Sequence, residues 1–183
     1  KNNTIMETFI LKSKINKKVC KDILNYFLKN KHKHVKPDFD EEVKTATEIP
    51  IAVSNNEYPF NKYKDELQKC VNKYRKKYKE VDNNLDRWNL IEDYNIQYYK
   101  PKQGFKKVHC ERSEKKNAKR VLVFMTYLTT VKNAGTVWPR QKFISECILG
   151  DTLIWPTDFT HIHKGIISKD KDKCIVTGWY TFE

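Results

Sequence analysis

The stretch RVLVFMTYLTT, residues 120–130, decides the class of fold. Its β-branched and aromatic residues are typical of a β-strand. Similar short segments lie at residues 94–100, 151–156, 161–167 and 173–182, and the sequences PKQG, KNAG and LGD provide turns between them. The second half of the chain is therefore expected to form a sandwich or barrel of short strands.

The first ninety residues have a helical periodicity instead. One apolar stripe lies in residues 15–30 and consists of Ile15, Val19, Ile23 and Phe27, with Leu24 and Leu28 beside it. A second stripe lies in residues 63–81 and consists of Tyr63, Leu67, Val71, Tyr74 and Tyr78. Apolar residues three and four positions apart predict amphipathic helices. Residues 33–50, between the two helices, indicate a loop with at most one short strand. The chain is thus expected to be an α+β protein.

The composition favours one folded domain spanning residues 1–183. A chain of this length with 39% hydrophobic and 13% aromatic residues can bury a substantial core. The net charge of +13 is compatible with binding to nucleic acid, but only five of the 36 basic residues are arginines. Arginine is the side chain that contacts phosphate and guanine with two parallel hydrogen bonds. A solvated lysine surface is therefore favoured over a nucleic-acid partner.

Cysteine usage and hydropathy suggest a cytoplasmic protein. Five cysteines are scattered along the chain without a C-x-x-C pair, which favours free thiols in a reducing compartment. No apolar segment reaches the length of a membrane span, so no membrane partner is expected.

Three of the five histidines fall in two short patterns, VHCE at residues 108–111 and THIH at residues 160–163. Alternate residues of a strand face the same side, so His109 should project with Glu111, and His161 with His163. Two histidines and one carboxylate on neighbouring strands form the ligand set of a non-haem Fe(II) centre. An H-x-E pattern alone also occurs by chance, as an ordinary histidine beside a glutamate. Here a second histidine and then a basic residue follow the H-x-E pattern along the chain, and this order strengthens the hypothesis of a metal site.

That basic residue is Lys173, at the start of the last predicted strand. Alternation would turn Lys173, Ile175, Thr177 and Trp179 to the inner face together. A lysine on an inner face is unfavourable unless it meets an anion, and a dicarboxylate such as 2-oxoglutarate is such an anion. The alternative is that Lys173 lies at a frayed strand end and reaches water.

Taken in order, these segments resemble the 2-oxoglutarate- and Fe(II)-dependent dioxygenases, most closely the prolyl 4-hydroxylase-like branch of bacteria, phages and large viruses. The similarity runs through YYKPKQGFKKVHCE, RVLVFMTYLTTVKNAGTVWP, LGDTLIWPTDFTHIHKG and KCIVTGW. The first ninety residues are similar only loosely, through a cysteine-bearing helix. The resemblance implies a double-stranded β-helix (jelly-roll) core with the metal site in residues 91–183, and mainly helical support in residues 1–90.

The resemblance also implies roles for single residues. The metal ligands would be His109, Glu111 and His163, with His161 as the second choice. The residues that bind 2-oxoglutarate would be Lys173, Tyr99, Thr177 and Trp179, and no catalytic residue beyond the metal centre is implied.

Two details of this ligand set need comment. The family usually has H-x-D where this chain has H-x-E, so Glu111 carries one additional methylene. His163 is preferred over His161 because a basic residue and a glycine follow it and because it precedes Lys173 by ten positions, as in the collagen-type branch. Cys110, between the two ligands of the H-x-E pattern, should face away from the metal and serve packing.

The implied activity is hydroxylation of a prolyl residue in a peptide or protein, with Fe(II) and 2-oxoglutarate required and ascorbate as an optional addition. One alternative is a cupin-like metal-binding protein without catalysis, which would not need an inward Lys173 or Tyr99. Another is an oxygenase that acts on nucleic acid or a small molecule. Nucleic-acid demethylation is disfavoured because the resemblance implies, for that branch, arginines on the last strands that hold the cosubstrate, whereas no arginine follows Arg140 here and Lys173 stands in their place.

Overall fold

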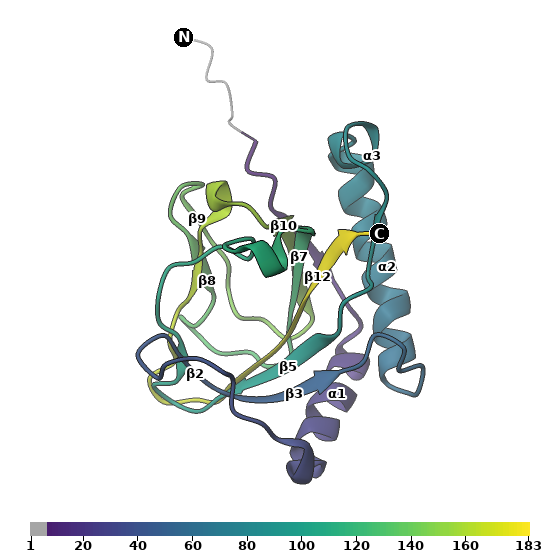
Figure 1. The fold of residues 1–183 in the computed structure, drawn as a ribbon. Coiled ribbons are helices and arrows are strands. Elements are labelled where there is room, and N and C mark those ends of the chain that lie inside the picture. Colours follow the sequence, from purple (N-terminus) through teal and green to yellow (C-terminus); the bar gives the residue numbers. More distant parts are fainter. Residues whose placement is uncertain (1–6) are drawn as a thin grey trace.

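The computed structural model describes residues 7–183 and arranges their strands in three antiparallel sheets (Figure 1). The largest has seven strands in the order β1-β10-β7-β12-β5-β3, with β4 paired to β12. A three-stranded sheet has the order β11-β8-β9, and β2 pairs with β6. The strands are β1 (Leu11–Lys14), β2 (Lys44–Thr45), β3 (Thr47–Ile51), β4 (Trp88–Asn89), β5 (Tyr94–Tyr99), β6 (Gly104–Phe105), β7 (Arg120–Tyr127), β8 (Thr136–Trp138), β9 (Phe143–Ile144), β10 (Asp151–Pro156), β11 (Lys164–Gly165) and β12 (Lys173–Phe182).

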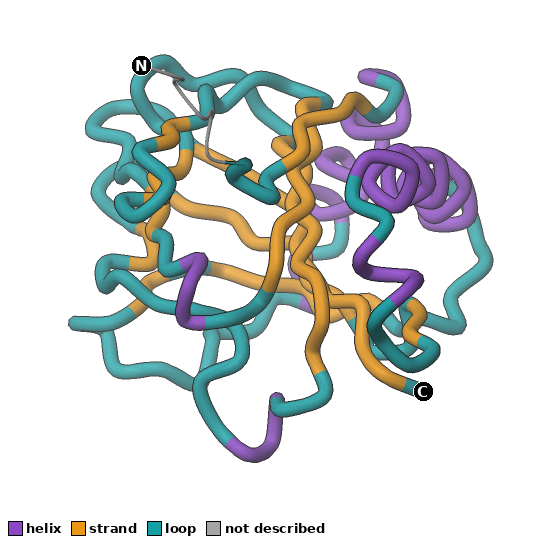
Figure 2. The backbone as a smooth tube through the Cα atoms, turned by 90° about the horizontal axis from the view of Figure 1, so that it is seen from above, coloured by secondary structure: helices purple, strands orange, loops and turns teal. Residues whose placement is uncertain are grey.

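The helices lie on one side of the large sheet, as the view from above shows (Figure 2). They are α1 (Lys17–Lys29), α2 (Phe60–Lys77) and α3 (Glu80–Asn83), and three 3₁₀ turns are η1 (Lys31–Lys33), η2 (Lys115–Asn117) and η3 (Phe159–His161). Helices on one face of antiparallel sheets confirm the predicted α+β class. No helix described for residues 7–183 combines the length and the apolar composition that crossing a bilayer requires.

The two faces of the large sheet pack against different partners. Side chains alternate along a strand, so β7 directs Phe124 toward the helices and Val123 and Met125 into the space between the sheets. On β10, Ile154 likewise faces the helices and Trp155 faces the space between the sheets. One face thus builds the helix-covered core, and the other is available to line a cavity.

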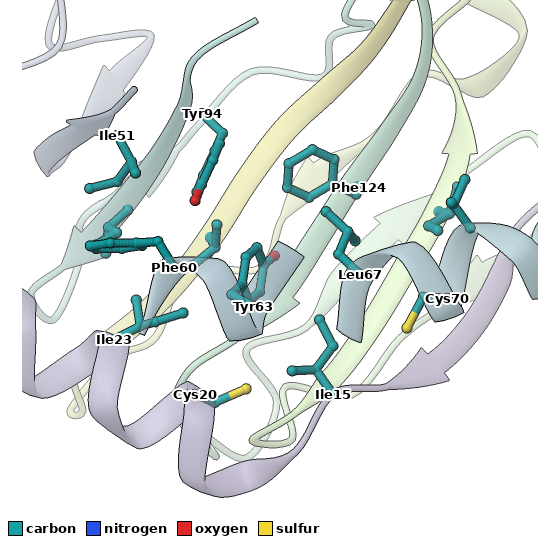
Figure 3. Packing of buried hydrophobic residues seen from close by; sticks show 14 of the residues in the cluster. Ile15, Cys20, Ile23, Ile51, Phe60, Tyr63, Leu67, Cys70, Tyr94 and Phe124 are labelled. Carbon is teal, nitrogen blue, oxygen red and sulfur yellow. The ribbon is translucent and has the colours of Figure 1, made fainter. Parts of the chain in front are cut away.

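The predicted apolar stripes of the helices form that core (Figure 3). Ile23 of α1 and Tyr63 and Leu67 of α2 are fully buried against Tyr94 and Phe124 of the sheet. The prediction is wrong for one member of the stripe, Leu28, which is 45% exposed. It is the second-last residue of α1 and follows Phe27, which is fully buried in the core.

The first ninety residues contribute more strands than their sequence suggested. β3 is the short strand anticipated within residues 33–50, and it forms one edge of the large sheet. β1, which the periodicity did not indicate, forms the opposite edge by pairing with β10. All five cysteines are free, and four of them are buried.

We expect Leu67→Ala to lower the free energy of unfolding by about 2–5 kcal/mol, because it empties a fully buried site between α2 and the sheet. The matched control is Leu28→Ala, which removes the same atoms from a half-exposed position and should change stability by less than about 0.5 kcal/mol. Urea denaturation of both variants measures the difference. Equal losses would contradict the described packing.

Candidate metal centre

His109, Glu111 and His163 lie together beside one cavity. The backbones of His109 and His163 are joined by two hydrogen bonds, 3.0 and 2.8 Å long, and the amide of Glu111 donates to the carbonyl of Thr157. Their side-chain ligand atoms all lie within 4.8 Å of one another. Glu111 Oε1 is 3.4 Å from Nε2 of His109 and 3.3 Å from Nε2 of His163. Two segments far apart in the sequence, residues 109–111 and His163, therefore meet at one carboxylate oxygen.

The other ring nitrogen of each histidine faces the backbone. Nδ1 of His109 is 3.0 Å from the carbonyl oxygen of Lys107, and Nδ1 of His163 is 3.0 Å from that of His161. A carbonyl only accepts, so each Nδ1 carries a proton, and each Nε2 is the nitrogen that faces Glu111 and would be available to a metal ion. This is the arrangement that orients histidine ligands in metal sites. The His109 ring is also stacked on Phe105, with centroids 3.6 Å apart.

Glu111 carries its charge in a largely buried position, with 15% of its side chain exposed. Burial alone would raise the pKa of its carboxyl, but the hydrogen bonds and charges of His109 and His163 hold the pKa well below its usual range. The second oxygen, Oε2, accepts a 2.9 Å hydrogen bond from the indole nitrogen of Trp179. The carboxylate is thus ionised and has a defined orientation.

The expectation that His161 faces the cavity together with His163 is wrong. Residues 159–161 form the turn η3 rather than a strand, which rotates His161 away. Its Nε2 lies 3.0 Å from the carbonyl oxygen of Thr8, and its Nδ1 lies 2.9 Å from the Thr160 hydroxyl. Burial lowers the pKa of His161. Its side chain therefore contacts the N-terminal segment at Thr8. Only its backbone carbonyl contributes to the centre, by accepting a hydrogen bond from Nδ1 of His163.

Lys173 lies on the inner face of β12 and is 5% exposed. Its Nζ donates 3.0 Å hydrogen bonds to the carbonyls of Ala134 and Ile166. Burial lowers its pKa to about 8. The sequence left open whether this ammonium reaches water at a frayed strand end, and the structure places it inside.

The expected inner row of β12 is also present. Lys173, Ile175, Thr177 and Trp179 all line the cavity, and Tyr99 lines it from β5 opposite Lys173. The Tyr99 hydroxyl donates to Gln97 Oε1 at 2.6 Å, while the Thr177 hydroxyl donates to the carbonyl of Phe124. Each hydroxyl can rotate to donate its proton to a ligand oxygen instead.

The cavity has a volume of about 620 Å³ and includes residues that sequence reasoning missed. They are Lys44, Glu48, Asn95, Gln97, Phe105 and Arg120. Lys44 and Glu48 form a buried ion pair of 2.6 Å on the wall formed by β2 and β3. Alternation on β5 would have identified Gln97 as the inner neighbour of Tyr99. The ion pair had no such signal, because the sequence indicated at most one short strand within residues 33–50, without its bounds, whereas Lys44 and Glu48 lie on two strands.

The residues fit a divalent metal ion. Two imidazole nitrogens and one carboxylate oxygen suit ferrous iron, and three protein ligands leave coordination positions free. Ligands about 2.1 Å from one ion, at roughly right angles, lie about 3 Å from one another. The separations of 3.3 and 3.4 Å from Glu111 Oε1 to the two Nε2 atoms are close to this value.

Neither a protein-family model nor a curated protein matches the sequence. Solved structures do match. The viral collagen prolyl hydroxylase of Paramecium bursaria chlorella virus 1, in complex with 2-oxoglutarate, has a TM-score of 0.75 at 15% identity, with 99% of this chain and 100% of that chain covered. The chain has the prolyl hydroxylase fold. The expected double-stranded β-helix core is thereby confirmed.

Two further structures have the same fold. A prolyl-4-hydroxylase of Pseudomonas putida has a TM-score of 0.69 at 10% identity, with 98% of this chain and 95% of that chain covered. A prolyl hydroxylase of Trichoplax adhaerens, in complex with a peptide of the hypoxia-inducible factor, has a TM-score of 0.69 at 12% identity, with coverages of 98% and 86%. At such identities the likeness establishes the fold of this chain and not its substrate.

We expect His163→Ala to abolish tight Co(II) binding and His161→Ala to retain it. The His163 side chain would supply a ligand, whereas the His161 side chain faces Thr8, and an alanine there keeps the carbonyl that holds His163. Anaerobic calorimetric titration of both variants measures the affinities. Loss of binding in the His161 variant alone would reverse the assignment.

Proposed function

We propose that this chain is a 2-oxoglutarate- and Fe(II)-dependent dioxygenase that hydroxylates a prolyl residue of a peptide or protein, with residues 1–183 acting as one domain. The observation that carries the proposal is the buried ammonium of Lys173 on the same cavity as the His109, Glu111 and His163 cluster. A protein that only bound a metal would not need this unfavourable charge. A dicarboxylate would use both ends of the cavity.

Lys173 is prepared to bind the distal carboxylate of 2-oxoglutarate. An ammonium has three donors, and the carbonyls of Ala134 and Ile166 occupy two of them. These bonds hold the side chain in place and leave the third donor for an anion. Because the position is dry, a charge-assisted hydrogen bond formed there is stronger than one at the surface.

The remaining walls orient the cosubstrate and exclude water. Tyr99 and Thr177 line the same cavity as Lys173, and their hydroxyls would donate to the oxygens of 2-oxoglutarate, which only accept. Trp179 lines the cavity near Glu111. His109, Glu111 and His163 would hold the ferrous ion, which, with 2-oxoglutarate and dioxygen, supplies the oxidising chemistry that converts a C–H bond into an alcohol. The protein's own contribution is ligation, binding of the cosubstrate and placement of the substrate.

A prolyl peptide is the substrate class that the neighbours favour. The viral and bacterial neighbours are prolyl hydroxylases, and the Trichoplax neighbour holds a peptide. Aromatic walls suit a pyrrolidine ring, and Phe105 and Trp179 flank the candidate metal centre. Ascorbate would serve as an optional reductant, tested by adding it to the assay.

Conversion of 2-oxoglutarate to succinate in the presence of Fe(II) and oxygen tests the activity. A proline-rich peptide should stimulate it, and alkylated single-stranded DNA should not. Metal binding without any succinate formation, with or without peptide, would favour the cupin-like alternative. Stimulation by DNA alone would move the substrate to nucleic acid.

We expect Lys173→Ala to raise the apparent 2-oxoglutarate requirement about tenfold to a hundredfold, since one buried charge-assisted contact is lost. Lys171→Ala removes a lysine from an exposed position two residues away and serves as the control. Succinate formation against cosubstrate concentration measures the effect, and Co(II) titration checks that the metal centre persists. An unchanged requirement would remove Lys173 from the binding site.

We also expect 2-oxoglutarate affinity to fall as the pH rises through about 8. The pKa of Lys173 is lowered to about 8, so the ammonium is present below this pH and is lost above it, while 2-oxoglutarate remains a dianion. Calorimetry between pH 7 and 9.5 on the metal-loaded protein measures the effect. Pyruvate, which lacks the distal carboxylate, is the control and should not show this loss. The same pH dependence for both acids would contradict the role of Lys173.

A further inference from the structure

The two carboxylate oxygens of Glu111 have different partners. Oε1 lies 3.3–3.4 Å from the Nε2 atoms of the two histidines. Oε2 accepts the indole N–H of Trp179 at 2.9 Å. Oε1 thus faces the candidate position of a metal ion, whereas Oε2 already accepts a hydrogen bond from Trp179.

The indole itself is held from behind. The guanidinium carbon of Arg120 lies 3.5 Å from the centroid of the Trp179 ring, the distance of a close stacking contact. Nε and Nη2 of Arg120 both donate to Glu92 Oε2, at 3.1 and 3.0 Å. A chain of contacts therefore runs from Glu92 through Arg120 and Trp179 to Glu111.

A β-bulge makes this stacking possible. In the pairing of β12 with β7, Tyr180 is opposite Leu122, but Thr181 is opposite Arg120, so Val121 is skipped. Without the skip, alternation would turn Arg120 to the helix-covered face, with Leu122. The bulge shifts the alternation by one residue and brings Arg120 to the cavity face beside Trp179, as bulges do where a side chain must be redirected.

We propose that Trp179 is a positioning residue that makes Glu111 a one-oxygen metal ligand, by holding Oε2 away from the metal while Arg120 and Glu92 hold the indole. The inference rests on the proposed metal centre. A glutamate has one more rotatable bond than the aspartate of an H-x-D pattern, so without a partner for Oε2 its carboxylate adopts several orientations, some of which present both oxygens or neither to the metal. Binding through both oxygens would occupy a position that substrate, cosubstrate or oxygen requires.

The test is a double-mutant cycle on Co(II) affinity, measured anaerobically by calorimetry. Trp179→Phe keeps the stacked ring and removes the N–H, and it should weaken Co(II) binding about tenfold to a hundredfold, the range for outer partners of metal ligands. In a Glu111→Asp background the shorter arm cannot reach both the metal and the indole. There, Trp179→Phe should change the affinity less than about twofold.

Trp88→Phe is the matched control, because the Trp88 indole donates to the carbonyl of Val81, outside the cavity. It should leave Co(II) affinity unchanged. The thermal midpoint of each metal-free variant shows whether it folds. If Trp179→Phe fails to fold, Arg120→Lys replaces it: it retains Trp179 and Glu111, removes the planar stack, and should weaken Co(II) binding by a smaller factor.

Unchanged Co(II) affinity in folded Trp179→Phe, or equal losses in both backgrounds, would overturn the positioning role. If Trp179→Phe does not fold, unchanged affinity in Arg120→Lys would overturn it. A different result would contradict the proposed metal centre itself, namely equal Co(II) affinities of the wild-type protein and Glu111→Ala. Failure of the centre and failure of the positioning role are therefore distinguishable within one series of titrations.

Discussion

The largely buried charge of Glu111 is the constraint on which the geometry of the cavity depends. An ionised carboxylate removed from water is strongly destabilising unless donors or cations surround it. Here the partners are His109, His163 and Trp179, from three segments far apart in the sequence. Stabilising one charge therefore ties together the segment before η2, the segment before β11 and the last strand.

The last strand provides both the core and the cavity because its side chains alternate. Cys174, Val176 and Tyr180 of β12 pack toward the helices, while Lys173 and Trp179 face the cavity. Gly178 lies on the helix-facing side, where an added Cβ would come within 2.6 Å of Tyr94 Cβ and closer still to the Phe124 ring. Because Gly178 has no side chain, Tyr94 and Phe124 can pack directly against the backbone of β12. The helix-facing core therefore holds in place the strand that carries Lys173 and Trp179.

Sequence periodicity predicted those features that depend on a regular period. The inner row from Lys173 to Trp179 follows from alternation, and the buried faces of α1 and α2 follow from helical spacing. His161 was misplaced because a 3₁₀ turn interrupts the assumed strand two residues before His163. Arg120 was not assigned to the cavity because the bulge at Val121 reverses its side, and bulges have no local sequence signal here. Edge strand β1 is held by pairing with β10, a long-range contact that composition cannot indicate.

Two buried lysines line the cavity, and they differ in whether a nearby carboxylate neutralises their charge. Lys44 is 6% exposed and has Glu48 at 2.6 Å, so the charge of the pair is largely cancelled within the wall. Lys173 is equally buried, but its hydrogen bonds go to the neutral carbonyls of Ala134 and Ile166. Carbonyl dipoles stabilise an ammonium without neutralising it, so its field remains available in a medium that screens poorly. An anion entering the cavity is therefore drawn toward Lys173 rather than Lys44. In the proposed function, a dicarboxylate held there at one end would present its other end to the cluster around Glu111.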